Sequence, residues 1–244
     1  MTTISDNLQG LRARLAKACA EAGRDVNDVT LLAVSKTFGP EAVEQALAAG
    51  QRAFGENYIQ EGVEKVLALR NTFPQAGVEW HCIGPVQSNK TRLVATHFDW
   101  VHSVDRLKTA QRLSEQRPEG LLPLQVCLQV NVDGGLNKSG VSPGELPDLA
   151  QAVAALPRLR LRGLMAIPEP SDDVAVQRAA FRQVRELLED LRRRGLPLDT
   201  LSMGMSDDLE AAVAEGATLV RVGRAIFGHR PRKEPLTSSA SGSA

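Results

Sequence analysis

The chain has 244 residues, 43% of them hydrophobic, and its 29 basic and 29 acidic side chains leave no formal net charge. A balanced charge argues against an extended nucleic-acid surface, which would need a basic excess. No apolar stretch approaches the ~18 residues of a membrane span, and no signal peptide opens the chain, so we expect a cytoplasmic globular protein without membrane or nucleic-acid partners.

The first predicted element is an amphipathic helix over about Ser5–Ala22, with Ser5 as its N-cap and Gly23 as the residue that ends it. Short apolar runs and amphipathic segments alternate after it. The predicted strands are Thr30–Ser35, Arg52–Gly55, Val78–Ile83, Trp100–Val104, Leu124–Val130, Leu161–Ile167, Thr200–Met203 and Leu219–Val222. The predicted helices between them are Glu41–Ala49, Gln60–Leu69, Lys90–Ala95, Leu107–Gln116, Leu146–Ala155, Val174–Arg194 and Leu209–Ala214.

Eight strands separated by helices predict an α/β fold, a (β/α)8 TIM barrel with an extra N-terminal helix. The strands are continuously apolar, which favours a parallel sheet, although a doubly wound open sheet would give a similar alternation. We expect a single domain over residues 1–230. The Ser/Ala/Gly-rich segment over residues 231–244 is predicted to be a disordered tail.

Lys36 stands directly after the apolar run Leu31–Ser35, at the carboxyl end of the first predicted strand. A parallel barrel keeps its chemistry at that end of its strands. An ammonium group that loses hydration there becomes a usable amine nucleophile, able to form a Schiff base with a carbonyl compound. The alternative is a lysine at the strand end that extends into solvent.

Two glycine-containing loops follow the seventh and eighth strands, where barrels often bind a phosphate group. Ser202–Asp207 includes Gly204 and the hydroxyl of Ser206, and Arg221–Gly228 includes Gly223 and Arg224. In each loop a glycine would let backbone N–H groups approach an anion just before a helix. The alternative is a pair of ordinary turns, in which glycine is common.

Arg221 interrupts the apolar eighth strand, and two-residue alternation places it on the same face as Leu219. An arginine inside a barrel needs an acceptor for its guanidinium, and a pyridine nitrogen would serve. The alternative is an outward arginine paired with Glu215.

Other chemistry-bearing residues give weaker signals. His81 and His102 lie within strands and are predicted to be hydrogen-bonded core histidines. The three cysteines are widely spaced, and no Cys/His cluster or carboxylate pair indicates a metal, so we expect a reduced compartment and no metal site.

Several motifs together resemble the YggS/PROSC family of pyridoxal phosphate homeostasis proteins, from the first helix to about His229. They are Val34-Ser35-Lys36, Phe54-Gly55-Glu56-Asn57, His81-x-x-Gly84-x-x-Gln87-Ser88-Asn89-Lys90, Asn131 with Lys138-Ser139-Gly140, Gly163-Leu164-Met165, Ser202-Met203-Gly204-Met205-Ser206 and Arg221-Val222-Gly223-x-x-Ile226-Phe227-Gly228. The resemblance implies an alanine racemase N-terminal-domain-like barrel that binds pyridoxal 5′-phosphate.

By that resemblance Lys36 forms the Schiff base, and Arg221 lies against the pyridine nitrogen. Ser206 and the backbone of Gly223 and Arg224 would hold the phosphate, and Asn57 would line the pocket. Arg224 departs from the family pattern, because many members have Thr or Ser there. A hydroxyl contact from this position to the phosphate is therefore not expected.

The resemblance further implies a role in vitamin B6 and amino-acid homeostasis, in which a monomer holds the cofactor on Lys36 and exchanges it or delivers it to apo-enzymes. Robust catalysis is not expected, because Arg221 only donates hydrogen bonds and so favours an unprotonated ring nitrogen. Racemases of this fold also use a tyrosine from a C-terminal β-domain that we expect to be missing; the sole tyrosine is Tyr58.

Three alternatives stay open at the level of sequence. One is a low-activity fold-type III enzyme, a racemase or decarboxylase with Lys36 as its single base. Another is an aldolase-type Schiff-base enzyme that acts on a phosphorylated sugar. The third concerns a second, weaker cofactor site on lysines that otherwise are solvated surface residues: Lys90, Lys138 and Lys233.

Overall fold

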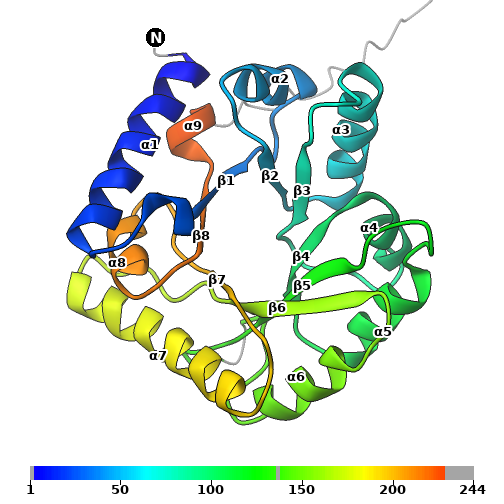
Figure 1. Cartoon of the computed structure of the whole chain (residues 1–244), viewed down its shortest axis with the longest axis vertical. Helices are drawn as coiled ribbons and strands as arrows, with labels where there is room; N and C mark the ends of the chain where they lie inside the picture. The colour runs from blue at the N-terminus through cyan, green and yellow to red at the C-terminus, as the bar shows by residue number, and fades with distance from the viewer. Residues whose placement is uncertain (1–2, 136–137, 229–244) are drawn as a thin grey trace, which may run out of the picture.

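The computed structural model describes residues 3–135 and 138–228. Its eight strands form a closed barrel in chain order, every neighbouring pair is parallel, and β8 (Leu219–Val222) closes the sheet on β1 (Thr30–Val34) (Figure 1). The predicted (β/α)8 barrel is therefore confirmed, and the open sheet is wrong. The predicted tail at 231–244 lies outside the described residues, and the single domain over 1–230 stays a prediction.

The bounds of the elements follow the predicted alternation. The other strands are β2 (Ala53–Glu56), β3 (Glu79–Cys82), β4 (Trp100–Val104), β5 (Leu124–Gln129), β6 (Leu159–Met165) and β7 (Thr200–Ser202). The helices are α1 (Ile4–Glu21), α2 (Pro40–Ala48), α3 (Ile59–Thr72), α4 (Thr91–His97), α5 (Leu107–Gln116), α6 (Leu146–Ala154), α7 (Val174–Arg193), α8 (Leu209–Ala214) and α9 (Arg224–Phe227), with a short 3-10 turn η1 (Val26–Asp28).

Most predicted bounds shift by one to three residues, and two of these differences have a clear physical cause. Strand β6 begins and ends two residues earlier than predicted, and Ile167 beyond it is 44% exposed. Helix α1 is capped by Thr3 rather than Ser5, because the Thr3 hydroxyl accepts the Asp6 N–H and the Asp6 carboxylate accepts the Thr3 N–H. This reciprocal pair satisfies two backbone donors that a helix start otherwise leaves without partners.

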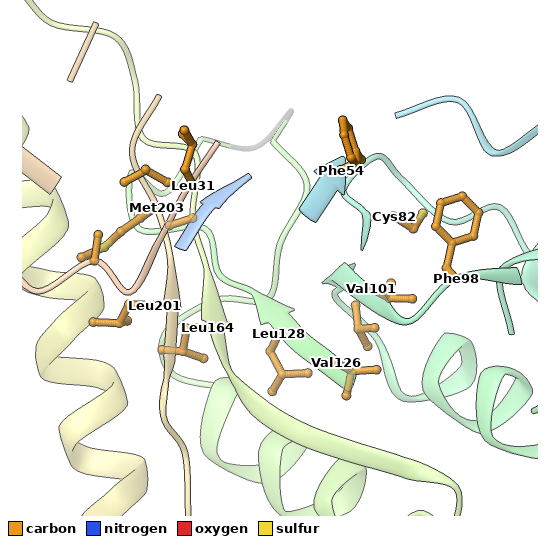
Figure 2. Packing of buried hydrophobic residues seen from close by; sticks show 14 of the residues in the cluster. Leu31, Phe54, Cys82, Phe98, Val101, Val126, Leu128, Leu164, Leu201 and Met203 are labelled. Atoms are coloured by element: carbon orange, nitrogen blue, oxygen red, sulfur yellow. The ribbon is translucent and has the colours of Figure 1, made fainter. Parts of the chain in front are cut away.

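Alternate residues of each strand point to different cores. Outward side chains such as Leu128, Leu164 and Leu201 point from their strands toward the surrounding helices and form the main core (Figure 2). Smaller clusters hold the remaining apolar strand residues: Leu32, Ala53 and Leu219 in one, Trp100, Cys127 and Met165 in the other. The inner core is small, which leaves room for polar side chains inside the barrel.

Helix α1 covers the seam at which the barrel closes. It packs on α8 and α9, and the Asn7 side-chain amide donates to the Ile226 carbonyl at 2.9 Å. Helix α1 therefore joins the end of the barrel to its beginning. In the described part of the chain, no helix combines the length and apolarity needed to cross a bilayer.

Candidate functional site

Asn57 directly follows β2, and Lys36 follows the neighbouring strand β1 after a single residue, Ser35. Leu32 belongs to a cluster inside the barrel. Lys36 lies four residues further on, and because strand side chains repeat every two residues, it lies on the same inner side at the carboxyl mouth. Both Lys36 and Asn57 are half-buried. The structure thus brings the predicted nucleophile and the predicted pocket residue to one edge of one mouth.

Asn57 carries an unused acceptor. Its Oδ1 is buried and has no hydrogen-bond donor among the described residues. A buried polar atom of this kind is costly unless a ligand or water satisfies it. Gly84 fixes the backbone here, because a Cβ at that position would collide with the Asn57 carbonyl.

The predicted phosphate loops lie at the same mouth. Gly223 follows β8 and caps α9, and a Cβ on it would stand 3.0 Å from the Val34 carbonyl, so the loop approaches the end of β1 closely. Ser206 follows β7 and is half-buried, and its carbonyl accepts from Arg14 Nη1 at 2.8 Å. The Arg224 side chain is exposed, so only its backbone N–H, at the start of α9, is placed for an anion.

Arg221 points into the barrel, as predicted. Its Nη1 donates to the carbonyl and the hydroxyl of Ser202 at 2.6 and 2.7 Å, and its Nη2 donates to the Ala166 carbonyl at 2.9 Å. Burial lowers the pKa of Arg221 to about 10. The alternative pairing with Glu215 is wrong, because that carboxylate instead binds arginines of α7: Arg178, Arg182 and Arg185.

A buried ion pair, which the sequence interpretation missed, supports the ends of β1 and β2 from outside the barrel. Lys65 of α3 donates to the Ser35 carbonyl at 2.8 Å, to Glu56 at 2.8 Å and to Glu61 at 2.7 Å. Burial raises the pKa of Glu56, and the charge of Lys65 partly offsets that effect. The sequence contained one indication of this ion pair. Lys65 shares the apolar face of its helix with Val66 and Leu69, which marks it as a buried lysine.

Glu61 also holds an unusual backbone conformation directly after Lys36. Its carboxylate accepts the Thr37 N–H at 2.6 Å, and Thr37 has a φ of 71°. A β-branched residue in the left-handed region is strained, and such residues cluster at functional sites. The chain therefore turns sharply just after Lys36.

His81 and His102 are buried and hydrogen-bonded to each other, at 2.9 Å between Nδ1 and Nε2 respectively, which confirms that they are partnered core histidines. His102 Nδ1 also lies 2.7 Å from the Ser202 hydroxyl. Ser202 contacts both Arg221 and His102 and was not singled out from the sequence. Among the described residues, no group of His, Cys, Asp and Glu is arranged to hold a metal ion.

The lysines considered for a second cofactor site differ in their surroundings. Lys138 binds Asp133 at 2.6 Å and Glu169 at 2.9 Å. Burial opposes its charge, but these carboxylates raise the pKa of Lys138, which favours the ammonium over a nucleophilic amine. Lys90 is half-buried at the start of α4, and Lys233 lies outside the described residues. The second site stays a prediction.

The sequence and fold were compared with those of known proteins. The alanine racemase N-terminal domain family matches residues 7–231. A Pseudomonas aeruginosa protein named pyridoxal phosphate homeostasis protein is 60% identical over 237 residues, which are 97% of this chain and 100% of the relative. The Escherichia coli K12 protein of the same name is 52% identical over 230 residues, 94% of this chain and 98% of its own.

Solved structures give the same assignment. PipY of Synechococcus elongatus, described with pyridoxal phosphate bound, is 38% identical and superposes with a TM-score of 0.81, over 93% of this chain and 100% of its own. The same protein without the cofactor gives a TM-score of 0.82 at 40% identity, with the same coverage of both chains. The chain therefore belongs to the alanine racemase N-terminal domain family and is similar over nearly its whole length to the pyridoxal phosphate homeostasis proteins.

Proposed function

We propose that the protein binds pyridoxal 5′-phosphate at the carboxyl mouth of the barrel and takes part in intracellular vitamin B6 homeostasis. The observation that carries this proposal is the convergence of Lys36, Asn57 and the loop after β8 at the β8–β1–β2 edge of one mouth. The relatives that share almost the full chain are named for this role.

The residues present fit the chemical groups of this cofactor. Pyridoxal phosphate supplies an aldehyde that condenses with amines and a ring that withdraws electrons. Lys36 would provide the amine, and the backbone N–H groups of Gly223 and Arg224 with the Ser206 hydroxyl would bind the phosphate. The buried Asn57 Oδ1 lacks a donor in the described structure and would accept one from the ligand.

Arg221 would face the ring nitrogen. Its three bonds to Ser202 and Ala166 use three of the five guanidinium N–H groups, so two remain for other acceptors. A guanidinium donates and does not accept, so it favours an unprotonated ring nitrogen. An unprotonated ring withdraws electrons weakly, and this supports a role in holding the cofactor over a catalytic one.

The finer proposal is a non-catalytic monomer in the cytoplasm that releases its cofactor to incoming amines or to apo-enzymes. Lys36 would hold the cofactor reversibly, since an amine can displace another amine from the same carbonyl carbon. Tyr58, the one tyrosine of the sequence, is exposed beyond β2, so it supplies no buried second base. A two-base racemase would need such a base.

The test is the absorption spectrum of the purified protein with added pyridoxal phosphate. A band near ~420 nm is expected for the cofactor attached to a lysine, and Lys36→Ala should abolish it. Lys17→Ala is the control, because Lys17 is also a lysine but its side chain is 77% exposed on α1. A wild-type protein that stays colourless with pyridoxal phosphate would overturn the proposal, as would a band that survives in Lys36→Ala.

The same protein preparations show whether the protein only binds pyridoxal phosphate or also catalyses a reaction with it. Wild-type protein loaded with pyridoxal phosphate is expected to leave L-amino acids unracemised and to release no carbon dioxide from them. Polarimetry and carbon dioxide trapping measure the two reactions. Turnover that Lys36→Ala abolishes would instead establish the enzyme alternative.

A further inference from the structure

A continuous chain of polar side chains crosses the interior of the barrel and ends on Arg221. Glu79 Oε1 lies 2.8 Å from His81 Nε2, His81 Nδ1 lies 2.9 Å from His102 Nε2, and His102 Nδ1 lies 2.7 Å from Ser202 Oγ. Ser202 Oγ accepts from Arg221 Nη1 at 2.7 Å. The chain thus links strands β3, β4, β7 and β8.

The chemistry of its two ends means that every hydrogen bond in this chain is donated in the same direction, from Arg221 toward Glu79. Arg221 donates only, so the Ser202 oxygen accepts from it, and with both imidazole rings neutral the Ser202 hydroxyl donates to His102 Nδ1. His102 then carries its proton on Nε2 and donates to His81 Nδ1. His81 in turn carries its proton on Nε2 and donates to Glu79, and an ionised carboxylate only accepts.

The charge states of the members agree with this direction. Burial, together with the nearby positive charge of Arg221, lowers the pKa of His102 well below its ordinary value, so the ring is neutral. Burial acts to raise the pKa of Glu79, but the His81 hydrogen bond and Arg162 hold it below its usual value, so it is a carboxylate. With both rings neutral and Glu79 accepting, the same contacts allow only the Nε2–H tautomer in each ring.

Glu79 lies at the opposite mouth from the candidate site. It begins β3, its side chain is 48% exposed, and it lines an open cavity of about 460 Å³ with Asp28, Arg162 and Asp199. Arg162 is held by Asp199 at 2.7 Å. Glu79 is therefore the point at which the buried chain reaches solvent.

Arg221 has no carboxylate within ion-pair distance in the described part of the chain. A buried guanidinium without a counter-charge is unfavourable, and three neutral acceptors offset this only partly. The hydrogen-bond chain partly compensates the charge of Arg221. Each hydrogen bond orients the next group so that the positive end of its dipole points away from Arg221 and toward Glu79.

We propose that Glu79 is a positioning residue for Arg221 and acts on it through His81, His102 and Ser202. The chain holds both histidines in the Nε2–H tautomer and keeps the Ser202 oxygen turned to accept from the guanidinium. The effect on pyridoxal phosphate rests on the proposed function, because it requires that Arg221 contacts the ring. The tautomers do not depend on that function.

The direct test is ¹⁵N NMR of protein labelled at histidine, recorded with and without pyridoxal phosphate. The sequence has four histidines, so spectra of the full-length variants His97→Gln and His229→Gln assign the two buried rings by difference. We expect Nδ1 unprotonated and Nε2 protonated in both His81 and His102. An Nδ1–H form of either ring would overturn the proposal.

Two charge-neutralising variants at the mouth that contains Glu79 test whether Glu79 influences Arg221 through the hydrogen-bond chain. Glu79→Gln removes the ionic acceptor, so both rings should show mixed tautomers, and the Kd for pyridoxal phosphate should rise about fivefold, equivalent to one hydrogen bond. Asp28→Asn removes a charge from the same cavity without touching His81, so tautomers and Kd should stay as in the wild type.

Ser202→Ala supplies the decisive comparison, because it interrupts the chain between His102 and Arg221. Glu79→Gln should then cause no further rise in Kd in the Ser202→Ala background. Equal effects in both backgrounds, or a Glu79→Gln protein that binds like Asp28→Asn, would overturn the coupling. A wild-type protein that binds no pyridoxal phosphate but shows the expected tautomers would contradict the proposed function and leave the chain established.

Discussion

Adjacent residues at the ends of β1 and β2 face opposite sides of the barrel wall. Lys36 and Asn57 face the mouth, whereas their predecessors Ser35 and Glu56 face α3, where the Ser35 hydroxyl donates to Glu56 at 2.6 Å. Two-residue alternation separates an inner pair, which faces the mouth, from an outer pair, which faces a helix, within the same short stretches of backbone. Lys65 completes the outer pair and ties both strand ends to one helix.

Lys65→Met tests the importance of this outer pair. The Lys65 side chain is 3% exposed and that of Glu56 is 0% exposed, so the variant leaves a buried carboxylate without its partner. The free energy of unfolding, measured with urea, should fall by about 3–5 kcal/mol. The double variant Glu56→Gln with Lys65→Met should recover part of that loss, and a double variant as unstable as the single one would contradict the explanation.

At the scale of elements, the mouth is shaped by two places where backbone meets backbone. Gly84 brings the loop after β3 against the Asn57 carbonyl, and Gly223 brings the loop after β8 against the end of β1. A side chain at either position would separate loops that must act together.

Gly84→Ala should therefore affect binding and stability together. The added methyl group collides with the Asn57 carbonyl, so Asn57 must move, and the Kd for pyridoxal phosphate should rise. The free energy of unfolding should fall by about 1–3 kcal/mol, as for other overpacked sites. Titration with pyridoxal phosphate and urea unfolding measure the two effects.

Gly10→Ala is the matched control for this substitution. Gly10 lies within α1 and has open space where a Cβ would be added. That variant should be more stable by about 0.5–1 kcal/mol, because alanine favours the helix, and its affinity for pyridoxal phosphate should not change. Equal losses in the two variants would contradict a local role for Gly84.

The sequence was sufficient for most of the fold because the signals are local. Apolar runs and helical periodicity located β4, α5 and β8 to the residue, and the count of eight strands selected the barrel. The Thr3 cap was missed because Ser5 offered an equally good capping residue nearby. Strand β6 was placed too late because Ala166 and Ile167 extend its apolar run past the last paired residue.

Only some residues of the candidate site could be predicted from the sequence. Lys36 and Arg221 stand out because each places a cation in or beside an apolar strand. Ser202 and Glu79 do not stand out, since their significance comes from partners on other strands, such as His102, which is 100 residues from Ser202 in the chain. No periodicity or motif spacing encodes a contact of that kind.

The molecule as a whole has an apolar shell around a partly polar centre. The main core lies between strands and helices, while the barrel interior holds His81, His102, Ser202 and Arg221. Stability therefore comes chiefly from the outer core, and the interior is free to carry charge and hydrogen bonds. That arrangement makes stability depend on pH.

Acidification should destabilise the fold through His102. Its pKa is lowered in the folded state by burial and by nearby positive charge, whereas an unfolded histidine titrates near ~6.5. Below that pH the unfolded chain binds a proton that the folded chain excludes, so the free energy of unfolding falls as pH falls, by up to ~1.4 kcal/mol per pH unit.

Urea unfolding at about pH 7.5 and about pH 5.5 measures this loss, in a window above the ordinary titration of carboxylates. His102→Asn should lose less stability than the wild type over the same interval. His97→Gln, at a partly exposed position on α4, should keep most of the wild-type dependence. An unchanged pH dependence in His102→Asn would assign the effect to other groups.

The β8–β1 seam and the Asn7–Ile226 contact also constrain how the protein is made. A ribosome releases β1 early, yet its second neighbour in the sheet is β8, which begins at Leu219 opposite Thr30. The contact between Asn7 and Ile226 likewise joins residues 219 positions apart. The nascent chain therefore carries an open sheet edge on β1 through most of synthesis. The loop after β8 reaches the end of β1 only when that edge closes, so a ligand that contacts both segments can be held only after β8 has emerged.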